Sequence, residues 1–585
     1  MSAMIAPDMT GGMNGMHGVR LLSNSVSAAL LVGVGALHGQ QAPQAAIDAI
    51  FADLTAPGSP GCALGVYREG KIVYAKGYGL ANVEENVPIT RRTLFDVGSV
   101  SKQVTAASIL LLERQGRLRL DDDVRKYLPE LPDYSAEGGR KVTILQLLNH
   151  TSGVRDYPTL FLLSGINLDN VTTNDDALRT IVRQRGLTFP PGSDWQYSNS
   201  GYLLLSLIVM HVTGKTLKDF IEENIFRPLG MVHSVYRNDH TLLIPHRALA
   251  YDAGENGTYK LSVSYAEETG DGMVQTSIED LQKWDENSYS ERVGGHGFSD
   301  EMEERGRLND GTVVDYAKGL FIGEYRGLRT VLHSGGSGGY HAYLLRFPQQ
   351  HFSVACLCNR GGVNRAKRVE AVADLYLERE LHSEHAAAAP RFTAEQLKSM
   401  TGVYQDLKRE DASRVSERGG KLWIEFEGSV LELRALTAEE FEPVPYPIPT
   451  SLRFELAEPG VRPHWILDTG FQLPVRAEAI EVTVPSGQEL TADAGDYWSD
   501  ELRVTYRLTV KDGTLWLSDL IGADGLSHPG TVPFDELRSL SADEFDLKGA
   551  PVVIHFKRDA GHNVIGFTLN GFHEPGLAFV RSNTK

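Results

Sequence analysis

The spacing of hydrophobic residues changes several times along residues 45–380. Two alternating runs in CALGVYREGKIVYAKGYG (62–79) meet at Glu69-Gly70 and predict a β-hairpin. Apolar residues with helical spacing follow at 101–115, 143–149 and 201–213, between turns rich in Pro, Gly and Asp. Three strand-like runs close the region: RTVLHSGG, GYHAYLLRFP and HFSVACLCN. The pattern predicts an α+β or three-layer domain whose sheet joins its first and last segments.

Beyond residue 394 the pattern becomes one of short strands and turns, and it occurs twice. GVYQ (402), KLWIEF (421), LTAEEFE (436) and LRFELAEPG (452) correspond to GDYW (495), TLWLSD (514), LSADEFD (540) and VIHFKRDAG (553). Tyr404 precedes Trp423 by 19 residues, and Tyr497 precedes Trp516 by the same interval. The repeat predicts two related all-β modules, and we expect small barrels because closure removes exposed strand edges. We expect the Trp and Tyr side chains to fill the barrel cores rather than to form a ligand platform.

A chain of 585 residues is too long for one hydrophobic core. The patterns divide it into a signal peptide or disordered tail (1–44), the α+β domain (45–380), a linker (381–394), β-module 1 (395–482) and β-module 2 (483–585). The formal net charge of −19 argues against nucleic acid or an anionic membrane as partner, since phosphate-binding surfaces need concentrated Lys and Arg. We expect a small-molecule or peptide substrate. Assembly into a homo-oligomer is possible.

The first 44 residues have the layout of a secretory signal. Arg20 precedes LLSNSVSAALLVGVGALHG, a moderately apolar run with small residues such as Val34 and Ala36 near its end. Interrupting Ser and Asn residues make the run too short and too polar for a membrane span. We therefore expect a periplasmic or secreted protein. A cytoplasmic location follows if the segment is not a signal.

Three cysteines cannot build a disulfide framework in a chain of this length. Cys356 and Cys358 lie two apart in a predicted strand, so we expect them to pack on one face of it. Cys62 is far away in sequence, and no C-x-x-C spacing occurs, which argues against a metal site.

Candidate chemistry begins in DVGSVSKQVTA (96–106), where Ser99 precedes Lys102 by three positions at the start of a buried helix. Side chains at i and i+3 share a helix face, so the Lys102 amine can reach the Ser99 hydroxyl. A serine hydroxyl needs a nearby base to become a nucleophile, and a buried lysine can lose its proton near neutral pH. The lysine could equally stay charged and lower the pKa of a neighbouring tyrosine. The spacing alone is a weak indication, because Ser is also a common helix N-cap.

Two further segments supply groups that such a nucleophile requires. Tyr197 and Asn199 stand in PPGSDWQYSNSGYLLL, just before an apolar helix. His333 lies in HSGG, on a strand that runs into a Gly-rich turn, and can donate to a substrate. The backbone N–H of Gly336 can approach a reacting carbonyl because no side chain blocks it.

In this order, S-x-x-K, Y-x-N and H-x-G resemble the motifs of the serine β-lactamase and penicillin-recognising enzyme family. The connecting phrases TILQLLNHTSG, PLGM, GDGMVQTSIEDLQKW and HSGGSGGYHAYLLRFP are similar to its class C and DD-peptidase branch. The resemblance covers about residues 45–380. It implies the family's sheet flanked by helices, with the active site between the helical lobe and the last strands.

The resemblance also implies a role for each candidate residue. Ser99 would be the acylated nucleophile and Lys102 its proton partner. Tyr197 would be the general base for acylation and, through water, for deacylation. The substrate would be held by Asn199, His333 and Gly335, and the oxyanion by the backbone N–H groups of Ser99 and Gly336. No metal or organic cofactor is needed, because Ser, Lys and Tyr supply the whole acyl-transfer chemistry.

His333 stands where many relatives have Lys, and a neutral His is a weaker anchor for a substrate carboxylate. This departure puts efficient β-lactamase activity in doubt. A catalytic domain followed by two barrels resembles the D-aminopeptidase branch, in which a barrel loop narrows the site and helps select substrates with a free amino terminus. We therefore expect a serine acyl-transfer hydrolase of small peptides or amides, similar to a D-aminopeptidase or DD-peptidase. An esterase or weak β-lactamase is the alternative, and a non-catalytic binding protein is a distant one.

Residues 335–339 (GGSGG) also fit G-x-S-x-G, the nucleophile elbow of another hydrolase fold. That elbow needs a helix after the serine. The sequence continues with YHAYLLRF, which alternates like a strand, so we do not expect Ser337 to be the nucleophile.

Overall fold

The computed structural model describes residues 44–136, 140–382, 390–406, 408, 410–426, 428–444, 450–455, 463–468, 470, 472–528 and 532–582. These described residues belong to one compact unit. The predicted signal peptide or tail lies outside the described residues except for its last position, and so does half of the predicted linker, residues 383–389.

A six-stranded antiparallel sheet joins the two ends of the α+β domain, as predicted. Its order is β10-β11-β12-β13-β1-β2, so the N-terminal hairpin pairs with the last strand of the domain. The strands are β1 Cys62–Arg68, β2 Lys71–Tyr78, β10 Phe321–Tyr325, β11 Leu328–Ser337, β12 Tyr340–Phe347 and β13 Phe352–Cys358. The predicted hairpin turn is confirmed, since Glu69 and Gly70 both have positive φ, 49° and 69°, as a type I′ turn requires.

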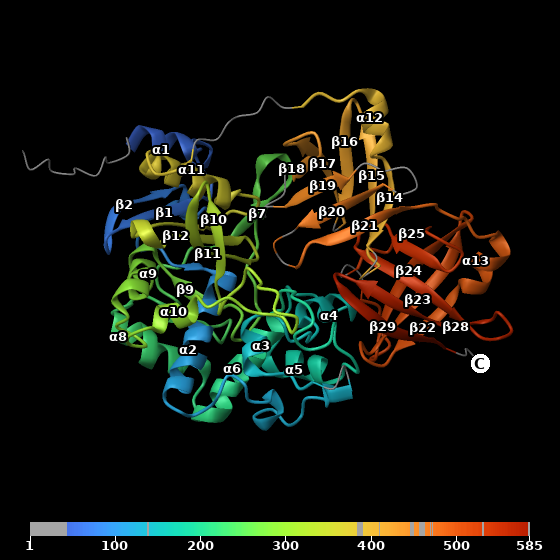
Figure 1. The fold of residues 1–585 in the computed structure, drawn as a ribbon, viewed down its shortest axis with the longest axis horizontal. Helices are drawn as coiled ribbons and strands as arrows, with labels where there is room; N and C mark the ends of the chain where they lie inside the picture. Colours follow the sequence, from blue (N-terminus) through green and yellow to red (C-terminus); the bar gives the residue numbers. More distant parts are fainter. Residues whose placement is uncertain are drawn as a thin grey trace, which may run out of the picture. The chain divides into compact units, whose positions relative to one another are not determined.

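The alternation along the central strands assigns each face of the sheet to a different layer. Leu64 and Val354 pack in a cluster that includes α1 (Gln44–Ile50) and α11 (Arg365–Leu377). Ala63 faces a larger core, which contains the helices that follow the hairpin in sequence. Figure 1 shows α1 and α11 on one side of the sheet and α9 (Ile278–Ser290) on the other.

The three predicted helical segments form α2 (Lys102–Arg114), α3 (Ile144–Leu148) and α6 (Asn199–Thr213) in the larger core. The apolar helix α6 ends at Gly214, whose φ of 71° is left-handed. No single described helix is both long and apolar enough to cross a membrane, and α6 passes that test only together with Leu217–Leu229, at a bend of 77°. The shorter elements are α4 Tyr157–Leu163, α5 Asn174–Val182, α7 Leu217–Ile221, α8 Arg227–Leu229, α10 Phe298–Met302, β3 Leu80–Asn82, β4 Val87–Pro88, β5 Phe95–Asp96, β6 Val235–Tyr236, β7 Tyr251–Ala253, β8 Tyr259–Leu261 and β9 Val274–Thr276.

Cys62 and Cys358 form a disulfide bond, which the sequence analysis did not anticipate. Their separation of 296 residues disappears in the fold because β1 and β13 pair with these residues directly opposite each other. Cys356 is free and buried, and it does share a strand face with Cys358, as expected.

Both β-modules are closed eight-stranded antiparallel barrels, which confirms the predicted architecture. Barrel 1 comprises β14 Gly402–Asp406, β15 Ala412–Arg418, β16 Lys421–Phe426, β17 Ser429–Ala435, β18 Glu440–Val444, β19 Ser451–Glu455, β20 His464–Asp468 and β21 Val475–Ile480. Barrel 2 comprises β22 Gly495–Ser499, β23 Val504–Lys511, β24 Thr514–Gly522, β25 Glu536–Ser539, β26 Glu544–Leu547, β27 Val552–Arg558, β28 Val564–Gly571 and β29 Glu574–Arg581. A short helix with a capping box precedes each barrel, α12 (Ala394–Ser399) and α13 (Gly487–Asp493).

The internal repeat extends to individual side chains. Tyr404 donates to the Met400 carbonyl and Tyr497 to the Asp493 carbonyl, over 2.9 and 2.7 Å, and both tyrosines are buried as predicted. The prediction is wrong for Trp423 and Trp516, which are only half-buried. Each stands between two buried aliphatic residues of its strand, so the alternation of the strand turns the indole to the outer face.

Candidate active site

Ser99 lies in a single 3-10 turn, Gly98–Ser101, that leads directly into α2. The turn is in close contact with β11: a Cβ on Gly335 would lie 1.9 Å from the Val97 carbonyl oxygen and 2.9 Å from the Ser99 nitrogen. Gly98 has a φ of +48°, and a Cβ there would lie 2.6 Å from the Gly336 nitrogen. Glycine is therefore required on both sides. The turn that carries Ser99 therefore lies directly against the strand segment that carries Gly336, and the oxyanion hole of their two N–H groups stays a prediction.

Lys102 is fully buried and makes three short contacts. Its Nζ lies 3.1 Å from Ser99 Oγ, 2.8 Å from Asn199 Oδ1 and 3.0 Å from the Asp271 carbonyl oxygen. Burial lowers the pKa of Lys102 to about 8, although the carboxylates of Asp271 and Asp156 favour the charged form. The lysine next to the serine is therefore close to losing its proton at neutral pH.

Tyr197 packs beside the Lys102 amine. Its ring centroid is 4.8 Å from Lys102 Nζ and 4.4 Å from the centroid of the His150 ring. Burial raises the pKa of Tyr197 well above its usual value, while a hydrogen bond with Ser99 lowers it. The phenol therefore keeps its proton at neutral pH and contacts the same serine as Lys102.

Asn199 is held by a carboxylate that the sequence analysis did not single out. Asp156 accepts from the Asn199 backbone N–H at 2.5 Å and from its side-chain amide at 3.3 Å. The backbone N–H of Asp156 donates in turn to Glu574 of barrel 2, at 2.7 Å, and Thr188 donates to the other oxygen of Glu574 at 2.6 Å. The second barrel is thereby linked through two steps to the amide that contacts Lys102.

His333 lies inside the wall of the site and is 1% exposed. Its Nε2 is 3.0 Å from the Tyr316 hydroxyl and its Nδ1 is 2.5 Å from the Ser334 carbonyl oxygen. Burial, and then the nearby Lys102 charge, lower the pKa of His333 to about 3. The imidazole is therefore neutral, and both ring nitrogens already have partners within the chain.

A cavity of about 350 Å³ opens above Ser99. Ser99, Tyr197, Asn199 and Gly336 all line it, whereas His333 and Gly335 do not. Four carboxylate residues also line it: Asp96, Asp169, Glu268 and Asp271. Its lining contains no Lys, Arg or His. The structure thus brings the predicted nucleophile, tyrosine and asparagine to one acidic cavity.

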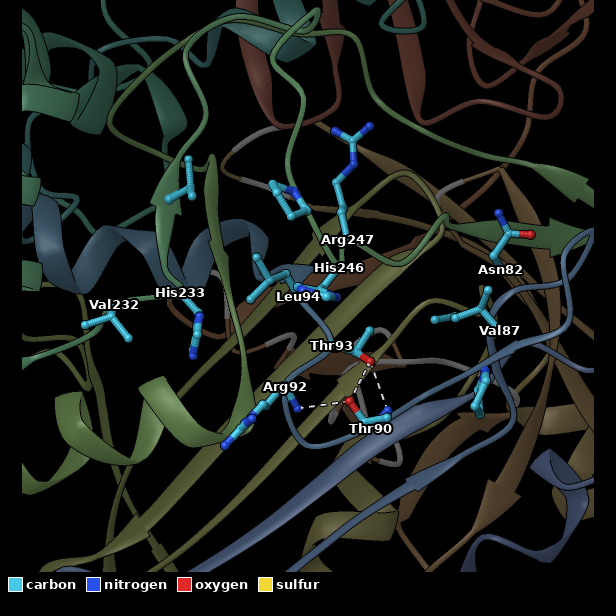
Figure 2. A pocket seen from close by; sticks show the side chains of 14 residues that line it. Asn82, Val87, Thr90, Arg92, Thr93, Leu94, Val232, His233, His246 and Arg247 are labelled. Carbon is cyan, nitrogen blue, oxygen red and sulfur yellow. Dashed lines mark hydrogen bonds between the residues drawn. The ribbon is translucent and has the colours of Figure 1, made fainter.

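A second and larger cavity, of about 600 Å³, contains none of the predicted site residues. Figure 2 shows that Thr90 and Thr93 point into it and hydrogen-bond each other, with Arg92, Arg247 and two histidines around them. Its lining holds no serine or cysteine, and the Thr90 and Thr93 hydroxyls bond each other and backbone N–H groups rather than a lining histidine. We therefore assign the chemistry to the acidic cavity.

The alternative serine does not have the surroundings that its motif requires. Ser337 ends β11, and the chain continues into β12 rather than into a helix, as expected.

Asp156, Glu268 and Asp271 are the residues that sequence reasoning missed. Asp156 follows the phrase TILQLLNHTSG by three residues, and Asp271 is part of GDGMVQTSIEDLQKW, so the phrases that carry the resemblance pointed to the correct segments. They could not show which side chains are buried beside Lys102.

A family model described as Beta-lactamase matches residues 47–377, more than half of the chain. The chain therefore belongs to the β-lactamase family. Penicillin-binding protein 4* of Bacillus subtilis (strain 168) is 32% identical over 309 residues, which make up 50% of this chain and 66% of that protein. A D-aminopeptidase of Gluconobacter oxydans (strain 621H) is 27% identical over 316 residues, 54% of this chain and 58% of that protein. The chain thus matches less than two thirds of the length of either relative.

A solved structure of an octameric penicillin-binding protein homologue from Pyrococcus abyssi has the same fold. It superposes with a TM-score of 0.54 at 24% identity, over 74% of this chain and 99% of that one.

Proposed function

We propose that this chain is a serine hydrolase that cleaves small peptides or amides through an acyl-enzyme at Ser99. The observation that carries the proposal is the buried Lys102 amine, 3.1 Å from Ser99 Oγ, with a pKa lowered to about 8. A D-aminopeptidase and a penicillin-binding protein among the relatives support the same reaction class.

The Lys102 amine donates in all three of its contacts. The charged amine gives one N–H each to Ser99 Oγ, Asn199 Oδ1 and the Asp271 carbonyl oxygen. When it loses a proton, which its pKa of about 8 allows near neutral pH, Asn199 and Asp271 keep the two remaining N–H groups and the lone pair faces the Ser99 hydroxyl. In the reaction the proton of Ser99 passes to Lys102 Nζ as Oγ forms a bond to the substrate carbonyl carbon.

The next step breaks the carbonyl–nitrogen bond of the substrate. The backbone N–H groups of Ser99 and Gly336 hold the developing oxyanion. The departing amine takes up the proton that Lys102 received, and the Tyr197 phenol, hydrogen-bonded to Ser99, is placed to relay it. Water then attacks the acyl-enzyme and gives one proton to the same pair, which releases the acid and restores Ser99. Lys102 is therefore the first base, in the role that the resemblance assigned to Tyr197.

Amides and peptides are favoured over β-lactams by the charge of the site. A β-lactam antibiotic carries a carboxylate, whereas the neutral His333 and an acidic cavity offer it no cation. We propose that hydrolysis of β-lactams is at most a side activity, and an esterase remains the alternative.

We also propose that the protein is exported. The Cys62–Cys358 disulfide supports this because such bonds persist in oxidising compartments. A homo-oligomer stays a prediction.

The pH dependence of Ser99 acylation tests the proposal. We expect the rate constant for labelling by an uncharged fluorophosphonate to rise with pH through about 8, as Lys102 loses its proton. Lys102→Arg keeps a permanent charge and should lower the rate by about 10³ or more above pH 8, with a difference that shrinks as the wild-type lysine is protonated at lower pH. A wild-type profile without this rise, or a Lys102→Arg variant that reacts at the wild-type rate, would contradict Lys102 as the base.

A further inference from the structure

The four carboxylates of the cavity differ in the hydrogen bonds, ion pairs or solvent that stabilise their charge. Asp96 accepts from the Gly98 N–H at 2.9 Å and from the Gln275 amide at 2.8 Å, and the Arg237 guanidinium lies 4.0 Å away. Asp271 accepts from the Tyr157 hydroxyl at 3.0 Å. Asp169 is exposed to solvent.

Glu268 is buried, and Thr172 and its own backbone N–H compensate its charge only in part. It is 1% exposed, and neither of its carboxylate oxygens makes a well-formed hydrogen bond with any described residue. Burial, against the opposing effect of Thr172 and with a smaller contribution from the Asp271 charge, raises its pKa to about 7. Leaving a buried carboxylate without a well-formed hydrogen bond is costly, because little replaces the water that it gave up.

We propose that Glu268 binds the free ammonium group of the substrate and thereby selects substrates with an unblocked amine. This inference rests on the proposed hydrolysis at Ser99. An ammonium group has three N–H donors and a positive charge, which are what the Glu268 oxygens lack in the free protein. Asp271, on the same wall, adds to the negative potential that the ammonium meets.

The geometry limits where on the substrate the amine can lie. Glu268 and Ser99 line the same cavity of about 350 Å³, which is small. The ammonium therefore belongs to the residue whose carbonyl is attacked, or to its immediate neighbour. The preferred substrates are amino-acid amides and short peptides cleaved at their amino-terminal end, and N-acylated substrates lose the contact.

The test compares alanine p-nitroanilide with N-acetyl-alanine p-nitroanilide, each in the D and L form. We expect the wild type to prefer the free amine by tenfold or more in kcat/KM. Glu268→Gln should abolish most of that preference by raising KM for the free amine, and it should leave the acetylated substrate nearly unchanged. Glu267→Gln is the matched control, because Glu267 is the preceding residue, pairs with His240 at 2.6 Å and does not line the cavity.

Two results would overturn the inference: a wild type without a preference for the free amine, or a Glu268→Gln variant that keeps it. Labelling of Ser99 by an uncharged fluorophosphonate monitors the fold, and it should proceed in Glu268→Gln at the wild-type rate. If neither anilide is turned over, the hydrolase proposal is at fault, and the amine site is tested by binding instead. Alaninamide should then protect Ser99 from the phosphonate at least tenfold better than N-acetyl-alaninamide does, and equal protection would refute the assignment.

Discussion

The two barrels have the same topology but contact the catalytic domain in different ways. Barrel 2 shares a hydrophobic core with α4, because Leu160 and Leu163 of that helix are fully buried among barrel side chains. It also supplies Glu501 to a buried ion pair with Arg155, at 3.1 Å, and Glu574 to Asp156. Barrel 2 is therefore part of the scaffold that holds the active site.

Barrel 1 approaches the same site through a smaller contact. Gln472 forms a β-bridge with Gln196, and Leu473 packs against the aromatic cluster that includes Tyr197. Lys408, 56% exposed, pairs with Asp194. The difference shows that a duplicated module can keep its internal structure while one copy is built into the core and the other touches the rim of the site.

The largest expected difference between the barrels is in the stability lost when each one's ion pair with the catalytic domain is broken, Glu501–Arg155 for barrel 2 and Lys408–Asp194 for barrel 1. Glu501→Ala leaves the buried Arg155 guanidinium without its counter-charge and should lower the free energy of unfolding by about 3–5 kcal/mol. Lys408→Ala removes an exposed lysine from the buried Asp194 carboxylate, which keeps the hydrogen bond from the Trp195 N–H, and should cost less, about 1–2 kcal/mol. Denaturant unfolding of both variants measures the two changes in the free energy of unfolding. Equal changes would contradict the claim that barrel 2 is bound to the catalytic domain more firmly than barrel 1.

Glu574 should make the barrel 2 contact sensitive to pH. Burial raises its pKa to about 7, so between its ordinary value and pH 7 the folded chain holds a proton that the unfolded chain has lost. Stability should therefore fall as pH rises through this window, by on the order of 2–3 kcal/mol from this group. Glu574→Gln should flatten the dependence. Identical slopes in the wild type and this variant would show that Glu574 does not titrate as described.

Leu473 tests whether barrel 1 influences catalysis at all. Leu473→Ala loosens the cluster beside Tyr197 and should lower kcat/KM by about threefold to tenfold through a small displacement of the phenol. Leu436→Ala, on the exposed surface of the same barrel, serves as the control. A Leu473→Ala variant with full activity would show that this contact of barrel 1 does not influence catalysis.

The smallest expected change in the free energy of unfolding comes from the equivalent tyrosines Tyr404 and Tyr497, and it should be the same in both barrels. Tyr404→Phe and Tyr497→Phe each remove the hydrogen bond to the carbonyl four residues earlier and should cost about 1 kcal/mol. Neither should change activity. Unequal losses would show that the repeat is not equivalent at this position.

The sequence predicted those parts of the fold that depend on local patterns. Alternation and turn residues located the hairpin at Glu69-Gly70, and the double pattern located both barrels. The same alternation, Leu-Trp-Ile and Leu-Trp-Leu, could have placed Trp423 and Trp516 on the outer faces. The preference of aromatic residues for cores misled that prediction.

Other features depend on pairing across hundreds of residues. The Cys62–Cys358 bond follows from the register of β1 against β13, which no local pattern specifies. In the site, the motifs led to Ser99, Lys102, Tyr197 and Asn199, but Glu268 matters only because it is buried and unpaired. Those are properties of the folded chain, and its neighbouring Glu267 looks the same in sequence.

The central claim is that Ser99 is the acylated nucleophile. The purified protein is incubated with a fluorophosphonate and with a fluorescent penicillin, and any adduct is mapped by intact-mass and peptide mass spectrometry. We predict a single phosphonate adduct on the peptide that contains Ser99, lost in Ser99→Ala and retained in Ser337→Ala. An adduct that persists in Ser99→Ala, or no adduct together with no turnover of amides or esters, would contradict the account.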